Sequence, residues 1–385
     1  MPHAIADEVP AQPVKPNYAS KLPAPTLERL QKAGVDLSQY PFWPERPSDV
    51  KLAAQVRAGV REHVDPGARA DKEKKALLGA PGVKHTLLTA HIGSEISGIQ
   101  LSQLTDQQKD ELALLIAERT VVFFGEQDLT PAQQRDLGAY FGEVEVHPTA
   151  AQVPGLPGVS IIWDELDPQK EAGHLGFRNA FATQDWHTDL THEKQPPGIT
   201  HLHNDTVPEV GGDTYWASGY SAYDHLSPLF REKIKDLKGV YRSAHAYPNP
   251  ADPDGPHVHI ERTHPLVRTH PATGWNSLFV NRKYTTRIDG LEPAESKILL
   301  NYLFDVYEKS LDSQVRFKWT PRTSALWDNR VSIHAAHEGK QPRHGTRVSS
   351  LAEVPYFDPK APSRREALGF DRPEDFVFNR KEAAY

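Results

Sequence analysis

The sequence predicts a mainly β protein with flanking helices, an α+β fold built on a jelly-roll or barrel core. From residue 83 onward, short runs rich in β-branched and aromatic residues alternate with Gly, Pro and Asp. Few stretches of this region have the apolar spacing of a long helix. Short strands with helices packed outside them favour a jelly roll or barrel over a repeating βαβ unit.

The first 82 residues are predicted to form a Pro-rich N-terminal arm with short helices, outside a main domain at 83–385. Prolines cluster in the first 50 residues, and proline interrupts regular structure because it lacks a backbone donor. Apolar spacing predicts one short helix over 26–33 and a second over 48–63. The polar stretch 64–80 is predicted to be a surface linker.

Within the main domain, the pattern predicts each element in turn. Strands are predicted at 83–92, 120–125, 158–163, 198–204, 278–281, 324–334 and 347–353. Helices are predicted at 105–119, 130–141 and 293–308. Two long irregular stretches, 164–184 and 247–265, interrupt the pattern, and loops of that length are usually functional lids or disordered.

Composition excludes several classes of function. There is no Cys, so disulfides, thiol nucleophiles and Cys-ligated metals are excluded, and any metal chemistry depends on His, Asp and Glu. The 44 Lys and Arg against 51 Asp and Glu give a net charge of -7, which argues against a nucleic-acid partner. The apolar runs are far shorter than the about 20 residues that span a bilayer, and the N-terminus does not resemble a signal peptide. We therefore expect no membrane partner and a cytoplasmic location.

A His-x-carboxylate pair in an extended segment places both side chains on one face, which suits two neighbouring positions on a metal. The pattern is weak by itself, because it occurs at His63/Asp65, His187/Asp189 and His203/Asp205, with His259/Glu261 as a variant. For any one pair alone, a hydrogen-bonded His near a solvated acid is the simpler interpretation.

Context distinguishes the pair His187/Asp189. A Gly-Gly-Asp-Thr turn follows at 211–214, and His334 ends the strand predicted at 324–334. Leu326, Asp328, Arg330, Ser332 and His334 would share one face of that strand. Two His and one carboxylate are typical of non-heme Fe(II) sites that keep open positions. Arg343 and Arg347 follow on one face of the next strand, where they could bind anions or lie on a solvated edge.

Several motifs resemble those of one enzyme family in the same order along the chain. They include WHTDLT (186–191), GGDTYWASGYSAYDHLS (211–227), HPLVRTHPATGWNSLFVNRKYTTRI (264–288), LWDNRVSIHAA (326–336) and RHGTR (343–347). Together they are similar to the taurine dioxygenase (TauD/TfdA-like) family of Fe(II)- and 2-oxoglutarate-dependent dioxygenases. The resemblance spans about residues 85–357.

This resemblance implies a double-stranded β-helix, a cupin-like jelly roll, with Fe(II) bound by His187, Asp189 and His334 as the catalytic centre. It implies that Thr214 and Arg343 hold the far carboxylate of 2-oxoglutarate. In members that act on sulfonates or sulfate esters, residues like His147 and Arg347 contact the acidic head group. Thr183 and Tyr284 complete the predicted substrate contacts, while a His bonded to backbone beside a Pro turn is the alternative for His147.

The predicted reaction uses O₂ and 2-oxoglutarate to hydroxylate a small anionic substrate, an alkyl sulfonate or sulfate ester, with release of succinate and CO₂. Thr183 and Ala150 depart from the pattern of taurine-specific members, so taurine itself is not favoured. Two alternatives stay open at this point. One is the same iron chemistry on a carboxylate such as an aryloxyalkanoate, an amino acid or a secondary-metabolite intermediate, and the other is a non-catalytic metal-binding β-barrel. The apolar segment 40–43 of the arm is typical of a docked segment, and a homo-oligomer, dimer or tetramer, is expected.

Overall fold

The computed structural model of the chain describes residues 18–43, 59–147, 150–166, 186–244, 246, 252, 255–336 and 343–369. Thr183, nearly all of the stretch 164–184 and most of the helix predicted at 48–63 lie outside the described residues. Residues 59–63, at the end of that predicted helix, are not helical. No described helix is long and apolar enough to cross a membrane.

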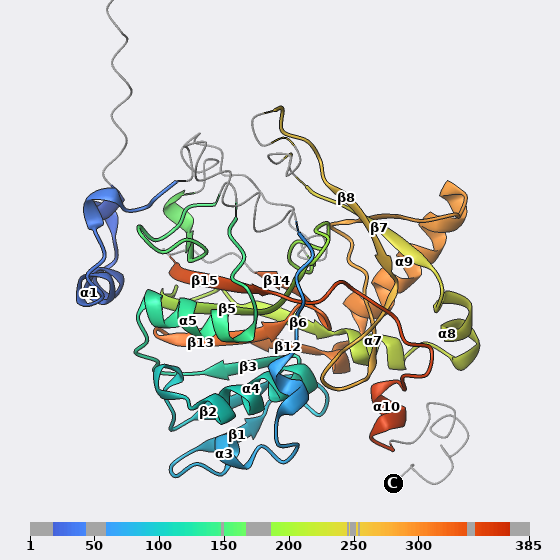
Figure 1. Cartoon of the computed structure of the whole chain (residues 1–385), viewed down its shortest axis with the longest axis horizontal. Helices are drawn as coiled ribbons and strands as arrows, with labels where there is room; N and C mark the ends of the chain where they lie inside the picture. The colour runs from blue at the N-terminus through green and yellow to red at the C-terminus, as the bar shows by residue number, and fades with distance from the viewer. Residues whose placement is uncertain are drawn as a thin grey trace, which may run out of the picture.

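Two facing sheets form the core of the domain (Figure 1). The larger sheet has the order β1 (Lys84–Leu87), β2 (Ser94–Ser97), β3 (Val121–Phe124), β13 (Thr323–Asp328), β5 (Pro197–Thr206), β15 (His344–Leu351) and β4 (Ser160–Trp163). The smaller has the order β12 (Gln314–Phe317), β6 (Thr214–Ser218) and β14 (Ser332–Ala336). Phe123 and Leu202 of the larger sheet and Trp216 of the smaller share one buried cluster. Apolar side chains thus fill the space between the sheets, and the predicted jelly-roll core is confirmed.

Helices lie against the outside of this core. The predicted helices appear as α4 (Asp106–Arg119), α5 (Pro131–Phe141) and α9 (Pro293–Lys309). A reciprocal capping box begins α4 at Thr105 and Gln108 and begins α5 at Thr130 and Gln133, which is why these helices start where the sequence predicts. α5 approaches β15 closely at Gly138, where a Cβ would lie 2.4 Å from Val348 Cγ1. Helix α5 therefore covers the outer face of the strand that follows Arg343 (Figure 1).

A second layer extends from the core on the side of α9. It contains the sheet β11 (Thr285–Ile288), β7 (Lys238–Arg242) and β8 (Glu261–Pro265), and the pair β9 (Val267–Thr269) and β10 (Asn276–Leu278). Helices α7 (Gly219–Asp224), α8 (Pro228–Ile234) and α10 (Arg364–Ala367) lie near it. The sequence patterns missed β2, β6, β7, β9, β11 and β12, and β8 occupies the end of the predicted loop 247–265. These short strands carry too few residues for a clear alternation.

The strand predicted at 324–334 is wrong as a single element. It consists of β13 in the larger sheet and β14 in the smaller one, joined by a turn at Asn329, Arg330 and Val331. The Asp328 carboxylate accepts from both the backbone N–H and the Nε of Arg330, each at 2.8 Å, and this closes the turn. Because the chain changes sheets here, the face predicted to join Leu326 to His334 does not continue through the turn.

The predicted surface linker at 64–80 is also wrong. Asp65, Pro66, Gly67 and Leu77 are buried, and the short helices Pro66–Arg69 and α3 (Lys75–Leu78) pack against α4. The Asp65 carboxylate accepts from the buried guanidinium of Arg330. A polar sequence can be buried when each charge has a partner. The helix predicted at 26–33 is present as α1 (Ala24–Lys32), while the domain boundary at residue 82 stays a prediction.

Candidate metal centre and active site

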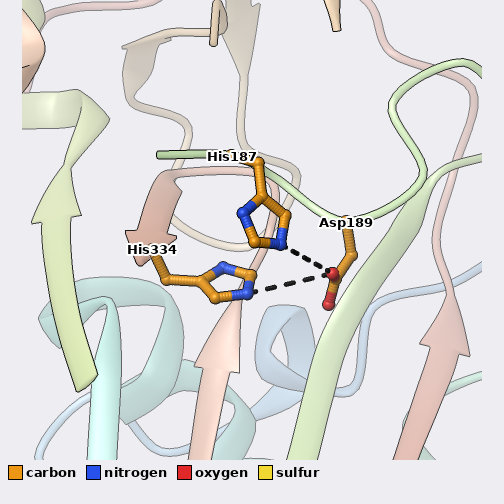
Figure 2. Close-up of side chains that lie close together, drawn as sticks. All are labelled: His187, Asp189 and His334. Carbon is orange, nitrogen blue, oxygen red and sulfur yellow. Dashed lines mark ion pairs between the residues drawn. The ribbon is translucent and has the colours of Figure 1, made fainter. Parts of the chain in front are cut away.

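His187, Asp189 and His334 meet on the inner side of the core (Figure 2). The Nε2 atoms of His187 and His334 lie 3.6 and 3.8 Å from the same carboxylate oxygen, Asp189 Oδ1. A backbone pair fixes the two histidines, since His187 N–H donates to His334 O at 3.0 Å and His334 N–H donates to His187 O at 2.8 Å. One potential ligand atom from each residue lies within 4.8 Å of the others.

The protonation states of these groups suit a divalent metal. Burial alone would raise the pKa of the Asp189 carboxyl, but the Arg347 guanidinium, 3.6 Å away, and the two histidines hold it well below its usual range. Burial, reinforced by His187, lowers the pKa of His334 to about 3. Asp189 Oδ2 is buried and has no hydrogen-bond donor among the described residues. An ionised carboxylate with an unused oxygen beside a neutral imidazole fits the donor set of a non-heme Fe(II) site.

Asn329, in the turn between β13 and β14, holds the segment that carries Asp189. Its Oδ1 accepts from the Asp189 backbone N–H at 3.3 Å and from Trp327 Nε1 at 3.2 Å. Its Nδ2 donates to Gly198 O at 3.0 Å and Thr200 Oγ1 at 2.8 Å. Leu190, directly after Asp189, has a φ of 48°, a conformation that the surroundings must impose on a branched residue. Sequence reasoning missed Asn329, although its place in the LWDNR motif could have indicated it.

Replacing Asn329 by alanine is expected to weaken Fe(II) affinity by about 10- to 100-fold, the usual cost of losing a group that orients a metal ligand. Metal-binding titration of the purified protein measures this. Asn276→Ala is the control, because Asn276 is buried and hydrogen-bonded to Thr269 outside the centre. Equal losses of affinity in the two variants would contradict the positioning role.

Thr214, Trp319 and Arg343 form a second group in the core. Trp319 Nε1–H donates to Thr214 Oγ1 at 2.9 Å, and the Arg343 guanidinium lies 5.8 Å from the centroid of the Trp319 indole. Trp319 thereby links Thr214 and Arg343, the two residues that the family resemblance assigns to the far carboxylate of 2-oxoglutarate. The sequence analysis missed Trp319, because nothing in the local pattern separates it from a core aromatic residue.

The side chains of Arg343 and Arg347 have different surroundings. Arg347 on β15 lies beside Asp189, whereas Arg343 lies over Trp319. Arg347 is opposite Leu202 in the register of β15 and β5, and Leu202 belongs to the cluster between the sheets. Both guanidinium groups therefore belong to the inner side of the core, and the alternative of a solvated edge strand is wrong for this pair.

Of the remaining predicted substrate residues, Tyr284 lies at the metal centre, with its ring centroid 6.1 Å from that of His187 in an edge-to-face arrangement. His147 is held by backbone, since its Nδ1 accepts from Ala150 N–H at 2.9 Å and its carbonyl accepts from Gln152 Nε2 at 3.0 Å. The backbone-bonded alternative for His147 is thus present. Because Nδ1 accepts this hydrogen bond, the proton of the neutral His147 ring lies on Nε2, which is then a hydrogen-bond donor.

The comparisons with known proteins agree with this geometry. The model of the family described as "Taurine catabolism dioxygenase TauD, TfdA family" matches residues 84–349. The chain belongs to this family. TauD/TfdA membership defines the enzyme class, so the protein is an Fe(II)- and 2-oxoglutarate-dependent dioxygenase, as the motifs predicted.

Relatives of this TauD/TfdA protein include an "Alpha-ketoglutarate-dependent sulfonate dioxygenase" from Saccharomyces cerevisiae, 35% identical, with 87% of this chain and 83% of that protein covered. An "Alkylsulfatase" from Acinetobacter baylyi is 32% identical over 69% of this chain and 84% of that protein. A crystal structure of a taurine dioxygenase from Burkholderia xenovorans has a TM-score of 0.62 and 32% identity, and the match covers 73% of this chain and 93% of that one.

Proposed function

We propose that this dioxygenase hydroxylates an alkyl sulfonate or an alkyl sulfate ester at the carbon next to the sulfonate sulfur or the ester oxygen. The observation that carries the proposal is the position of Arg347, whose guanidinium lies 3.6 Å from Asp189 Oδ1. A cation at this point can bind an acidic head group directly beside the reacting centre. The sulfonate dioxygenase of yeast and the alkylsulfatase of Acinetobacter, by their names, support this substrate class.

In this proposal His187, Asp189 and His334 hold Fe(II) and leave open positions on the metal. When bound, Fe(II) with 2-oxoglutarate and O₂ supplies the oxidising power, and succinate and CO₂ are released. Arg343 and Thr214 bind the far carboxylate of 2-oxoglutarate, with the guanidinium positioned by the Trp319 indole. A planar guanidinium can hold a carboxylate through two parallel hydrogen bonds, which fixes its orientation as well as its position.

Arg347 and the Nε2–H of His147 bind the anionic head group, and Tyr284 forms a wall beside His187. Thr183 is a further proposed substrate contact. Hydroxylation next to the head group gives a product that carries a hydroxyl and a sulfonate or sulfate on the same carbon. This product is unstable, and it splits into a carbonyl compound and sulfite or sulfate. The chain's own contribution is to bring that C–H to the metal and to exclude water.

Product analysis tests the proposal. The Fe(II)-loaded protein is incubated with 2-oxoglutarate, O₂ and alkyl sulfonates, alkyl sulfates or aryloxyalkanoates, and succinate, sulfite and sulfate are quantified. We expect sulfite or sulfate in a one-to-one ratio with succinate. Succinate formed only with carboxylates, with retention of the hydroxyl group, would support the carboxylate alternative and contradict the proposed substrate class.

The two arginines are expected to affect different substrates. Arg343→Gln should raise the KM for 2-oxoglutarate by about 10- to 100-fold, because a charge-assisted hydrogen bond contributes about 1.5–3 kcal/mol. Arg347→Gln should instead raise the KM for the sulfonate or sulfate ester by a similar factor. Initial rates with each substrate varied in turn measure both effects, and the opposite pattern would show that the two roles are exchanged.

The proposal also includes a small-molecule anionic partner, a cytoplasmic location and a homo-oligomer, the last two of which stay predictions from the sequence. Size-exclusion chromatography with light scattering tests the oligomeric state. A monomeric mass would contradict the expected dimer or tetramer.

A further inference from the structure

A buried polar cluster lies on the outer face of the larger sheet, directly behind the strand that carries Arg347. It joins Arg29 of α1 and Tyr40 of the N-terminal arm to Asp205 at the end of β5 and to His344 and Thr346 of β15. Tyr40, Asp205, His344 and Thr346 are all buried. The arm residues precede the segment 84–349 that matches the TauD/TfdA family.

Arg29 is the centre of this cluster. Its Nη1 donates to Asp205 Oδ2 at 3.2 Å and to Thr346 Oγ1 at 3.0 Å, and its Nε donates to Leu129 O at 2.9 Å. Its Nη2 donates to Gln134 Oε1 at 3.4 Å, and Gln134 also receives the Thr346 hydroxyl at 2.6 Å. One guanidinium thus ties together α1, the start of α5, β5 and β15.

Asp205 occupies an irregular position in the sheet. His344 pairs with Thr206 and Gly345 pairs with Asn204, so Asp205 is an extra residue in β5 with no partner on β15. A β-bulge of this kind bends a strand and redirects its side chains, and bulges are common next to active sites. This bulge lies opposite the peptide bond between His344 and Gly345, close after Arg343, and Arg29 forms an ion pair with the carboxylate of the bulged residue, Asp205.

The residues that the arm holds alternate with the two arginines along the strand. The His344 ring contacts Tyr40 of the arm, and the Thr346 hydroxyl contacts Arg29 of α1 and Gln134 of α5, so both side chains face outward, while Arg343 and Arg347 belong to the inner side, next to Trp319 and Asp189. The Tyr40 hydroxyl is hydrogen-bonded to His344 Nε2 at 2.7 Å. A shift of β15 that broke the outer contacts would move both guanidinium groups, because neighbouring residues of a strand move together.

We infer that Arg29 and Tyr40 of the arm are positioning residues for catalysis, which fix the part of β15 that presents Arg343 to 2-oxoglutarate and Arg347 to the anionic substrate. This inference rests on the proposed roles of the two arginines. It assigns the arm a function in cosubstrate binding, in addition to its apolar packing through Leu30 and Tyr40 against Trp163 and Val348.

The test compares Arg29→Met and Tyr40→Phe with wild type in the full-length protein. Under anaerobic conditions, 2-oxoglutarate is titrated into the Fe(II)-loaded protein, and its dissociation constant is read from the visible absorption of the complex. We expect the dissociation constant to rise about tenfold in Arg29→Met and about threefold in Tyr40→Phe, because small displacements of a positioning group reduce productive binding strongly. The Fe(II) affinity and the kcat at saturating substrates should stay within about twofold.

Arg231→Met is the matched control, since Arg231 has a similarly buried side chain and forms ion pairs with Asp224 and Glu366. Arg231 belongs to α8, which lies on the far side of the molecule from α1 (Figure 1). Its dissociation constant for 2-oxoglutarate should equal that of wild type. If Arg29→Met does not fold, Tyr40→Phe decides alone, because it removes one hydroxyl and keeps the ring in the apolar cluster.

Arg343→Gln separates the two ways in which the inference can fail. If Arg343→Gln weakens 2-oxoglutarate binding while both arm variants leave it unchanged, the inference is overturned and the proposed function stands. A rise in Arg231→Met equal to that in Arg29→Met also overturns the inference, because the effect would then be general destabilisation. If Arg343→Gln leaves binding unchanged, the proposed role of Arg343 fails and the inference fails with it.

Discussion

The His187→Ala protein is expected to lose Fe(II) binding and turnover together, with turnover reduced by more than about 100-fold, the upper loss seen when only a supporting group around a metal is removed. His187 supplies one of three potential ligand atoms that lie within 4.8 Å of one another, and without it only Asp189 and His334 would remain to hold Fe(II). Fe(II) retained after dialysis and the visible absorption of the anaerobic complex with 2-oxoglutarate measure binding without turnover.

His225→Ala is the control for this experiment. His225 is also a histidine near a carboxylate, with its Nε2 3.3 Å from Asp312 Oδ2. This pair is exposed, and neither residue belongs to the group of potential metal ligands found among the described residues. The His225→Ala protein should bind Fe(II) as tightly as wild type. An absorption band that persists unchanged in His187→Ala would rule out the assignment of the iron site.

Replacing Arg330 by methionine is expected to lower the free energy of unfolding by about 3–5 kcal/mol, the usual cost of removing one partner of a buried ion pair. The Arg330 side chain is 1% exposed and pairs with the carboxylates of Asp65, Asp328 and Glu353. Burial alone would raise the pKa of the Glu353 carboxyl, but the guanidinium groups of Arg268 and Arg330 lower it to about 2. Without Arg330, three carboxylates would share a buried region with too little positive charge.

Urea unfolding at neutral pH measures this loss, with Arg316→Met as the control. Arg316 forms an ion pair with Asp213 at 2.6 Å, but its side chain is 60% exposed, and exposed pairs contribute at most about 1 kcal/mol. A loss below about 1 kcal/mol in Arg330→Met would show that the buried carboxylates are stabilised in another way.

The sequence by itself determined the features that depend on neighbouring residues. The capping boxes at Thr105 and Thr130 fixed the starts of α4 and α5, because an N-cap and its partner are only three residues apart. The spacing of His187 and Asp189 placed both side chains on one face of an extended segment, but it was the surrounding motifs that distinguished this pair from the other His-x-carboxylate pairs. The fold class followed from short β-rich runs bounded by turn residues, and the roles of His334 and Arg343 followed from motifs that occur in a fixed order along the chain.

Only the tertiary structure decided how distant segments meet. It divided 324–334 between two sheets at Asn329, buried Asp65 against Arg330, and placed Trp319 between Thr214 and Arg343. It also brought Arg29 to Asp205, 176 residues along the chain. The stability of such contacts depends on burial and on the pairing of charges, and both arise from residues that are remote in sequence. For that reason no local pattern could reveal them.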